Sequence, residues 1–188
     1  VNFFISGFNG FLGRILGDVL SKNGQKTQDI NVLSDKKIDI TKPFVLAKPE
    51  GDFVIIHAAG KAHSIPKTVE EKRLFYDVNY CGTQNLCNAL KPHLVSLKGF
   101  VFISTVSVYG IDSGRDINEN FPLNAQSPYG VSKIKAEKYL TQWGLENNVP
   151  VLILRLPLIS GPNPPGNLGK MIKGIDSGKY FSIKNGAA

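Results

Sequence analysis

Apolar runs and turn residues divide the chain into short blocks that predict strands and helices in alternation. Consecutive apolar residues predict buried strands over residues 2–6, 30–33, 38–40, 53–57, 100–104 and 151–154. Helical spacing and capping residues predict helices over residues 11–22, 69–90, 128–147 and 168–177. Because the strands are continuously apolar, we expect an α/β fold in which helices cover both faces of a doubly wound parallel sheet.

Three glycines stand between the first predicted strand and the first predicted helix. Gly7, Gly10 and Gly13 form the pattern G-x-x-G-x-x-G. Glycines at such a turn let the backbone approach a pyrophosphate, and the free N–H groups of the helix start attract phosphate. The pattern predicts the phosphate cradle of a dinucleotide, with a simple tight turn as the alternative.

An acidic residue that closes the second strand of such a fold binds the adenosine ribose. Asp35 follows the strand predicted over residues 30–33, and Lys36 and Lys37 come directly after it. The carboxylate favours NAD and the lysines favour NADP, while a solvated turn is a third interpretation. Asp39 and Ile40, which end the third predicted strand, are expected to flank the adenine.

A phenol and an ammonium lie four residues apart on the helix predicted over residues 128–147. Tyr129 and Lys133 therefore share one helix face. A phenol with a pKa of about 10 is a poor base at neutral pH, and a nearby lysine lowers that pKa. Thr105 follows a predicted strand, at the sheet edge where such folds bind ligands. Tyr180 and Lys184 repeat the spacing in a stretch that reads as extended, and we expect no site there.

Length and charge limit the classes of protein that the chain can belong to. The 188 residues, 42% of them hydrophobic, suffice for one globular domain. The sequence contains no run of 18 apolar residues, so no membrane span is predicted. The chain begins without a basic leader, so we expect a cytoplasmic protein. The net charge of +7 comes from scattered lysines, which favours a phosphate-bearing small ligand over nucleic acid. The histidines His57, His63 and His93 are far apart, so no metal site is predicted.

Six segments of the chain form a set of motifs in a fixed order. They read GFNGFLG (7–13), HAAG (57–60), DVNYCGTQNL (77–86), FISTVSVYG (102–110), SPYGVSK (127–133) and LRLPLISGP (154–162). Together they resemble the extended short-chain dehydrogenase/reductase family, in its nucleotide-sugar 4-epimerase and 4-ketoreductase branch. The resemblance implies a Rossmann-like fold that binds NAD, with NADP not excluded, and a nucleotide-sugar substrate. It also implies that Tyr129 is the acid/base, that Lys133 holds the nicotinamide ribose and tunes Tyr129, and that Thr105 orients the reacting oxygen.

The resemblance assigns further residues to the cofactor and the substrate. In addition to the glycines, Tyr129 and Lys133, the implied cofactor-binding residues are Asn9, Phe11, Leu12, Asp35, Asp39, Ile40, Ala58, Ala59, Gly60, Asn79, Ser104, Pro157 and Ile159. Asn167 and Leu168 are expected to meet the substrate diphosphate, in addition to Thr105 and Tyr129 at the sugar. Asn79 and Asn167 also have simple structural interpretations, as a hydrogen-bonding residue within a helix and a helix cap.

Two departures from the family pattern narrow the expected function. Val106 and Ser107 stand where sugar 4,6-dehydratases carry an Asp-Glu pair, so elimination of water is disfavoured, and 4-epimerisation and 4-ketoreduction both stay open. Residues 1–160 are expected to form the NAD(P)-binding domain and 161–188 the beginning of a substrate-binding portion that is largely absent.

The main alternative to an enzyme is a dinucleotide-sensing module without chemistry. A homodimer through residues 69–90 and 128–147 is expected by analogy.

Overall fold

Five parallel strands form a single sheet in the computed structural model, which describes residues 1–62, 64–162, 164 and 166–179. The strands are β1 (Asn2–Ser6), β2 (Lys26–Asp29), β3 (Phe53–His57), β4 (Leu97–Thr105) and β5 (Val151–Leu156), in the order β2-β1-β3-β4-β5. The chain winds outward in both directions from β1, which confirms the doubly wound topology. Such a sheet binds ligands where the winding reverses, beyond the carboxyl ends of β1 and β3.

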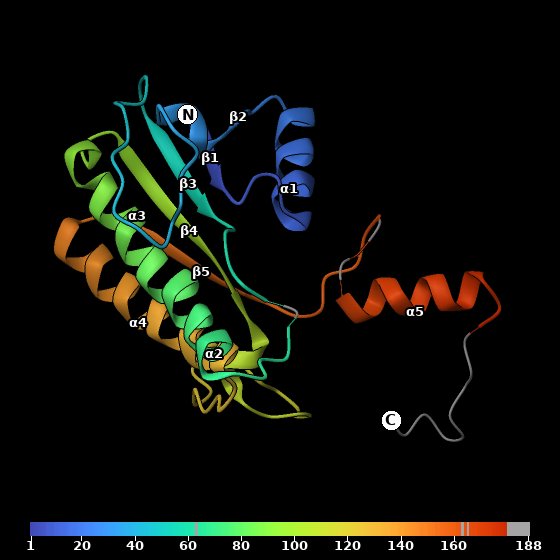
Figure 1. Cartoon of the computed structure of the whole chain (residues 1–188). Helices are drawn as coiled ribbons and strands as arrows, with labels where there is room; N and C mark the ends of the chain where they lie inside the picture. The colour runs from blue at the N-terminus through green and yellow to red at the C-terminus, as the bar shows by residue number, and fades with distance from the viewer. Residues whose placement is uncertain (63, 163, 165, 180–188) are drawn as a thin grey trace.

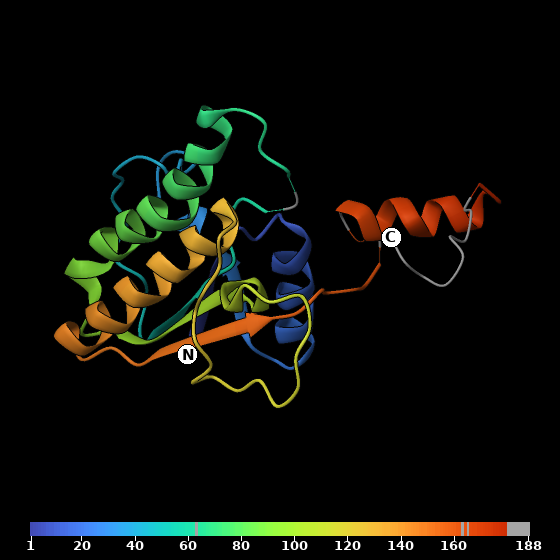
Figure 2. The same cartoon turned by 90° about the horizontal axis from the view of Figure 1, so that it is seen from below.

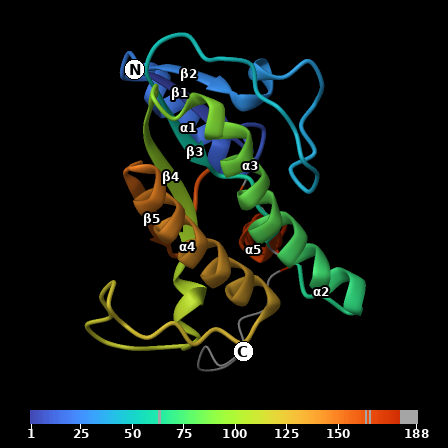
Figure 3. The same ribbon diagram turned by 90° about the vertical axis from the view of Figure 1, so that its left-hand side faces the viewer.

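Helices cover both faces of the sheet, as predicted. The α-helices of the described residues are α1 (Phe11–Lys22), α2 (Val69–Tyr76), α3 (Gly82–Leu90), α4 (Pro128–Asn147) and α5 (Gly166–Asp176). α1 lies on one face, while α3 and α4 lie side by side on the other (Figures 1 and 3). α5 stands apart from the sheet (Figure 2). None of the helices in the described part of the chain combines the length and the apolar character that a membrane crossing requires.

The main core fills the space between the sheet and the α3–α4 layer. Phe100 and Phe102 of β4 are fully buried there, and Trp143 of α4 meets the Phe100 ring edge-on at 5.8 Å between centroids. Burying each such aromatic side chain contributes roughly 1.5–3 kcal/mol. The carboxyl end of β4 and the start of α4 are therefore held on a rigid base.

The helix predicted over residues 69–90 is continuous but contains a π-helical segment. Asp77–Cys81 separates α2 from α3 and accommodates an extra residue within the turn. α2 begins with a capping box in which Thr68 and Glu71 satisfy each other's backbone N–H groups. π-helical segments often occur at functional sites, and this one carries Asn79.

The strands predicted over residues 30–33 and 38–40 are wrong. Ile30–Leu33 is a 3₁₀ turn whose first N–H groups are capped by Asp29: the Asn31 N–H donates to its Oδ1 at 3.0 Å. Residues 38–40 lie in a loop. The second strand is instead Lys26–Asp29, which is polar because it lies at the edge of the sheet and pairs only with β1.

Candidate active site

A cavity of about 610 Å³ opens at the carboxyl ends of the strands and unites most of the predicted site. It lies between the loop after β1, the loop after β3, the end of β4, the start of α4 and the segment after β5. The predicted residues that line it are Gly7, Gly10, Phe11, Leu12, Gly13, Ala58, Gly60, Ser104, Thr105, Tyr129, Lys133, Pro157 and Ile159. Val106 and Ser107, which directly follow Thr105, also line it. Further lining residues had not been singled out from the sequence: Lys61, Ala62, Ile103, Leu156 and Leu158.

The three glycines form a turn that has no room for side chains. Gly7 has a φ of +75°, and a Cβ there would lie 2.6 Å from the backbone nitrogen of Ala59. A Cβ on Gly13 would overlap the carbonyl oxygen of Gly7. Gly10 precedes α1 as its N-cap and supplies no side-chain acceptor to the first N–H groups of the helix. Bare backbone at a helix start fits a dinucleotide diphosphate.

Tyr129 and Lys133 line the cavity from the first two turns of α4. Ser127 caps this helix by accepting a hydrogen bond from the Gly130 N–H at 3.1 Å, and Pro128 occupies the first turn, as predicted. The Tyr129 ring packs on the buried Phe75 ring of α2, with 6.1 Å between centroids. The phenol is thus held by the helix start on one side and by α2 on the other.

Burial raises the pKa of Tyr129, and the neighbouring Thr105 hydroxyl opposes that rise. Burial disfavours the charged phenolate, so the phenol carries its proton at neutral pH in this structure. Lys133 is not among the groups that shift the pKa of Tyr129, so the expected lowering is not seen. The Lys133 ammonium instead donates to the carbonyl oxygen of Ile103 at 2.8 Å. The site as it stands suits proton donation.

Lys133 is a buried amine whose charged form is disfavoured mainly by burial. Its Nζ lies 4.5 Å from the centre of the Phe102 ring, and burial lowers its pKa to about 8, while Glu137 one turn further along α4 opposes the shift. A Cβ on Gly60 would lie 3.3 Å from this Nζ. The backbone of the loop after β3 therefore runs directly over the lysine.

Thr105 ends β4 beside Tyr129 and is already oriented by the next turn. Its hydroxyl accepts a hydrogen bond from the Ser107 N–H and donates one to the Ser107 hydroxyl, both at 3.2 Å. Ser104, the preceding residue, is buried and donates to the carboxylate of Glu137. Ser104 and Thr105 thus both line the cavity, and Ser104 also joins β4 to α4.

Asn79 does not line the cavity but holds the loop that does. Its side chain accepts from the Lys61 N–H at 2.7 Å and donates to the Lys61 carbonyl oxygen at 3.1 Å. It also donates to the Ser132 hydroxyl at 2.9 Å, which in turn donates to the Tyr129 carbonyl oxygen at 2.7 Å. One buried amide in the π-helical segment therefore joins the loop after β3 to the helix that carries Tyr129.

His57 extends this network and was not predicted to take part in it. The Thr83 hydroxyl donates to the Asn79 carbonyl oxygen, so its oxygen accepts from His57 Nε2 at 3.0 Å. Ser6 then donates to Nδ1 at 2.6 Å. Burial and, to a smaller extent, Lys133 lower the pKa of His57 to about 3, so the ring stays neutral and its role is structural. No metal-binding cluster occurs among the described residues, which exclude His63.

Asp35 was predicted to close the second strand, and that placement is wrong. β2 ends at Asp29, whereas Asp35 is an exposed residue in a bend beyond the 3₁₀ turn. Asn9, in the glycine-rich turn, donates to Asp29 Oδ2 at 3.0 Å, so this carboxylate lies beside the cradle. Asp29 could have been found only as the last residue of β2. The strand is polar and lies at the sheet edge, so a search for apolar runs does not detect it.

The remaining predicted residues lie away from the cavity. The Asp39 carboxylate accepts hydrogen bonds from the N–H and the hydroxyl of Thr41, at 3.1 and 2.6 Å, while Ile40 packs against Gly82. The residues expected at the substrate diphosphate fall in the first turn of α5, outside the cavity lining, and the side chain of Asn167 is outside the described part. Tyr180 and Lys184 also lie outside the described residues.

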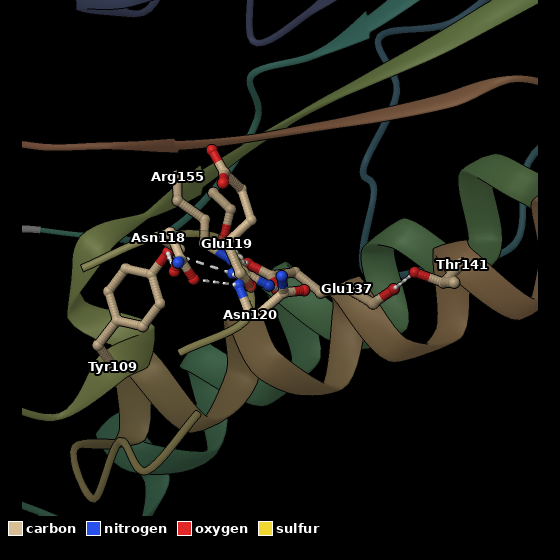
Figure 4. Close-up of polar contacts among 8 residues, drawn as sticks. Tyr109, Asn118, Glu119, Asn120, Glu137, Thr141 and Arg155 are labelled. Atoms are coloured by element: carbon tan, nitrogen blue, oxygen red, sulfur yellow. Dashed lines mark hydrogen bonds and ion pairs between the residues drawn. The ribbon is translucent and has the colours of Figure 1, made fainter. Parts of the chain in front are cut away.

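A partly buried ion pair lies next to the cavity and joins four parts of the chain (Figure 4). Arg155 of β5 donates to Glu137 of α4 through Nε, at 3.1 Å, and Nη2, at 2.8 Å. Its Nη1 donates to the Glu119 carbonyl oxygen at 2.8 Å and to the Tyr109 hydroxyl at 3.2 Å. This guanidinium fixes the long segment after β4 onto β5 and onto α4, the helix that carries Tyr129 and Lys133.

Curated relatives of the chain are sugar-modifying enzymes. The N-acetyl-alpha-D-glucosaminyl-diphospho-ditrans,octacis-undecaprenol 4-epimerase of Escherichia coli O157:H7 is 30% identical over 98% of this chain and 57% of its own length. The GDP-6-deoxy-D-mannose reductase of Pseudomonas aeruginosa is 31% identical over 81% of this chain and 50% of its own length. The chain thus spans about half the length of these relatives.

The fold and the family model agree with these relatives. The structure of RMD from Pseudomonas aeruginosa, complexed with NADPH, superimposes with a TM-score of 0.76 at 26% identity, over 96% of this chain and 64% of that one. The model of the NAD dependent epimerase/dehydratase family matches residues 3–185. The chain therefore belongs to the NAD dependent epimerase/dehydratase family.

Proposed function

We propose that the chain is the cofactor-binding and catalytic part of an NAD(P)-dependent enzyme that oxidises or reduces C4 of a nucleoside-diphosphate sugar. One observation carries this proposal: Thr105, Tyr129 and Lys133 line the same cavity as the glycine cradle. A sensor of dinucleotides needs the cradle but not these three side chains. The two relatives support the same chemistry: one is a 4-epimerase of a lipid-linked sugar, and the other is a GDP-6-deoxy-D-mannose reductase.

In the proposed reaction the residues of the chain move a proton while the cofactor accepts or supplies a hydride. Tyr129 exchanges the proton of the C4 hydroxyl, and Thr105 orients that oxygen from the end of β4. Lys133 would hold the nicotinamide ribose with an amine that burial leaves easy to deprotonate. Val106 and Ser107 offer no carboxylate for elimination, so the chemistry is 4-epimerisation or 4-ketoreduction.

A binding panel tests the proposal. We expect the melting temperature to rise with NAD or NADP, and to rise further when one of a set of UDP-, GDP- and dTDP-sugars is added. Turnover is followed by the absorbance of the reduced nicotinamide or by the change in sugar configuration. Tight cofactor binding without turnover of any sugar would favour the dinucleotide-sensing alternative instead.

Asp29 is the residue that we propose sets the choice between NAD and NADP. Its carboxylate, beside the cradle, would bind the ribose hydroxyls of NAD and repel a 2′-phosphate. Asp29→Asn is expected to shift the ratio of the two dissociation constants toward NADP by about tenfold, equivalent to about 1.4 kcal/mol. Titration calorimetry checks this, with the exposed Asp35→Asn as control. A shift in the Asp35 variant alone would restore Asp35 as the selecting residue.

A further inference from the structure

The cavity has two charged side chains among its lining residues, and both are lysines. Lys133 belongs to the proposed catalytic set, whereas Lys61, in the loop after β3, has no place in it. No carboxylate is among the described residues that line the cavity. A concave, partly enclosed surface with charge of one sign concentrates ligands of the opposite sign.

Lys61 is fixed at its backbone and directed along an aromatic surface. Asn79 binds both its N–H and its carbonyl oxygen, at 2.7 and 3.1 Å. Its Nζ lies 5.3 Å from the centre of the Phe75 ring, which itself packs on Tyr129. The ammonium is therefore placed at the Tyr129 end of the cavity by contacts that leave its hydrogen-bond donors free, because a ring face accepts none of them strongly.

No acidic side chain compensates Lys61 within the described part of the chain. The ion pairs there join other basic residues to Asp39, Asp77, Asp52 and Glu137. Lys133, the other cavity lysine, is already committed to the Ile103 carbonyl oxygen. A compact ammonium with free donors is suited to phosphate and carboxylate oxygens.

We propose that Lys61 binds an acidic group of the second ligand, the nucleotide sugar, at the Tyr129 end of the cavity. This inference rests on the proposed function, under which the glycine cradle at the other end takes the phosphates of the dinucleotide. The acidic group is a phosphate of the diphosphate bridge or a carboxylate on the sugar ring. Both chemistries need one cation at this place, and the experiment separates them.

Three variants isolate the charge of Lys61. Lys61→Met keeps the stem that covers Phe75 and removes the ammonium, while Lys61→Arg keeps a cation. Lys135→Met is the matched control, because Lys135 also lies over an aromatic ring, Tyr76 at 5.0 Å, but is exposed and does not line the cavity. Melting temperatures confirm that all variants fold.

Binding is measured by calorimetry with NAD at saturation, so that the cradle is filled. The probes are UDP, UDP-glucose, UDP-glucuronate and inorganic diphosphate. Lys61→Met is expected to weaken binding at least tenfold, Lys61→Arg to stay within about threefold of the parent and Lys135→Met to match it. A loss shared by all four probes identifies the diphosphate as the partner, and a loss confined to UDP-glucuronate identifies the carboxylate.

Equal affinities of the parent and Lys61→Met for every probe would overturn the inference. So would a loss of NAD affinity with unchanged binding of the other probes, because Lys61 would then serve the cofactor. If the parent binds NAD but no nucleotide sugar, that result contradicts the proposed function and leaves the inference on Lys61 to be decided separately. Inorganic diphosphate then still decides whether Lys61 is an anion-binding residue, since its binding either depends on the Lys61 ammonium or does not.

Discussion

Tyr129→Phe is expected to slow hydride transfer to or from a nucleotide sugar by about 10²- to 10⁴-fold, the usual contribution of a general acid or base. Tyr129 carries an ionisable phenol that shares the cavity with Thr105, and it lies at the start of a capped helix. Phenylalanine keeps the ring that packs on Phe75, so the substitution removes only the proton-carrying oxygen. Single-turnover absorbance of the reduced nicotinamide measures the effect.

A second tyrosine of the same helix provides the control for that experiment. Tyr139 is partly buried, packs on Tyr80 and does not line the cavity. Tyr139→Phe is therefore expected to leave hydride transfer unchanged. Transfer by Tyr129→Phe within tenfold of the parent, which is less than 1.4 kcal/mol of barrier, would show that another group moves the proton.

Arg155→Met is expected to lower the free energy of unfolding by about 3–5 kcal/mol, the cost of leaving a buried charge without its partner. The Glu137 side chain is only 3% exposed and lies 2.8 Å from the guanidinium. The substitution also removes the donors to Glu119 and Tyr109, which hold the segment after β4. Urea unfolding monitored by circular dichroism gives the free energy.

Two further variants show whether the unpaired carboxylate causes this loss. Arg73→Met removes an exposed pair, in which Arg73 is 78% exposed and 3.6 Å from Asp77, and should cost less than about 1 kcal/mol. Adding Glu137→Gln to Arg155→Met should recover part of the stability, because no charge is then left in the core. Equal losses from Arg73→Met and Arg155→Met would contradict this account.

The order of the elements was predictable because most strands and helices carry strong apolar patterns. Of the two strands predicted wrongly, the first contains Ile30 and Leu33, which are buried as their apolar character predicts but lie in a 3₁₀ turn and not in a strand. The true second strand is polar and lies at the sheet edge. The acidic residue expected at the end of the second strand was therefore predicted as Asp35, whereas the strand ends at Asp29.

The site was predictable where a local pattern carries the chemistry, as with the glycines and the pair Tyr129 and Lys133. The residues that fix this pair in place escaped prediction because their contacts cross long distances in sequence. His57 meets Thr83, and Arg155 meets Glu137, only after the sheet has formed. Lys61 was not predicted as a site residue for the same reason. The sequence does not show which residues line the cavity with it, or that none of the described ones is a carboxylate.

The wide turn of the π-helical segment gives its helix one residue more than uniform α-helical winding would hold. Deleting one residue within Asp77–Cys81 would let the remaining four close as ordinary α-helix, so α2 and α3 would keep nearly the same relative orientation and Phe75 would stay on Tyr129. The change would be confined to the wide turn, which places the Asn79 amide between Lys61 and Ser132. Such a shortening would therefore release the loop after β3 while leaving the aromatic contacts of the site intact.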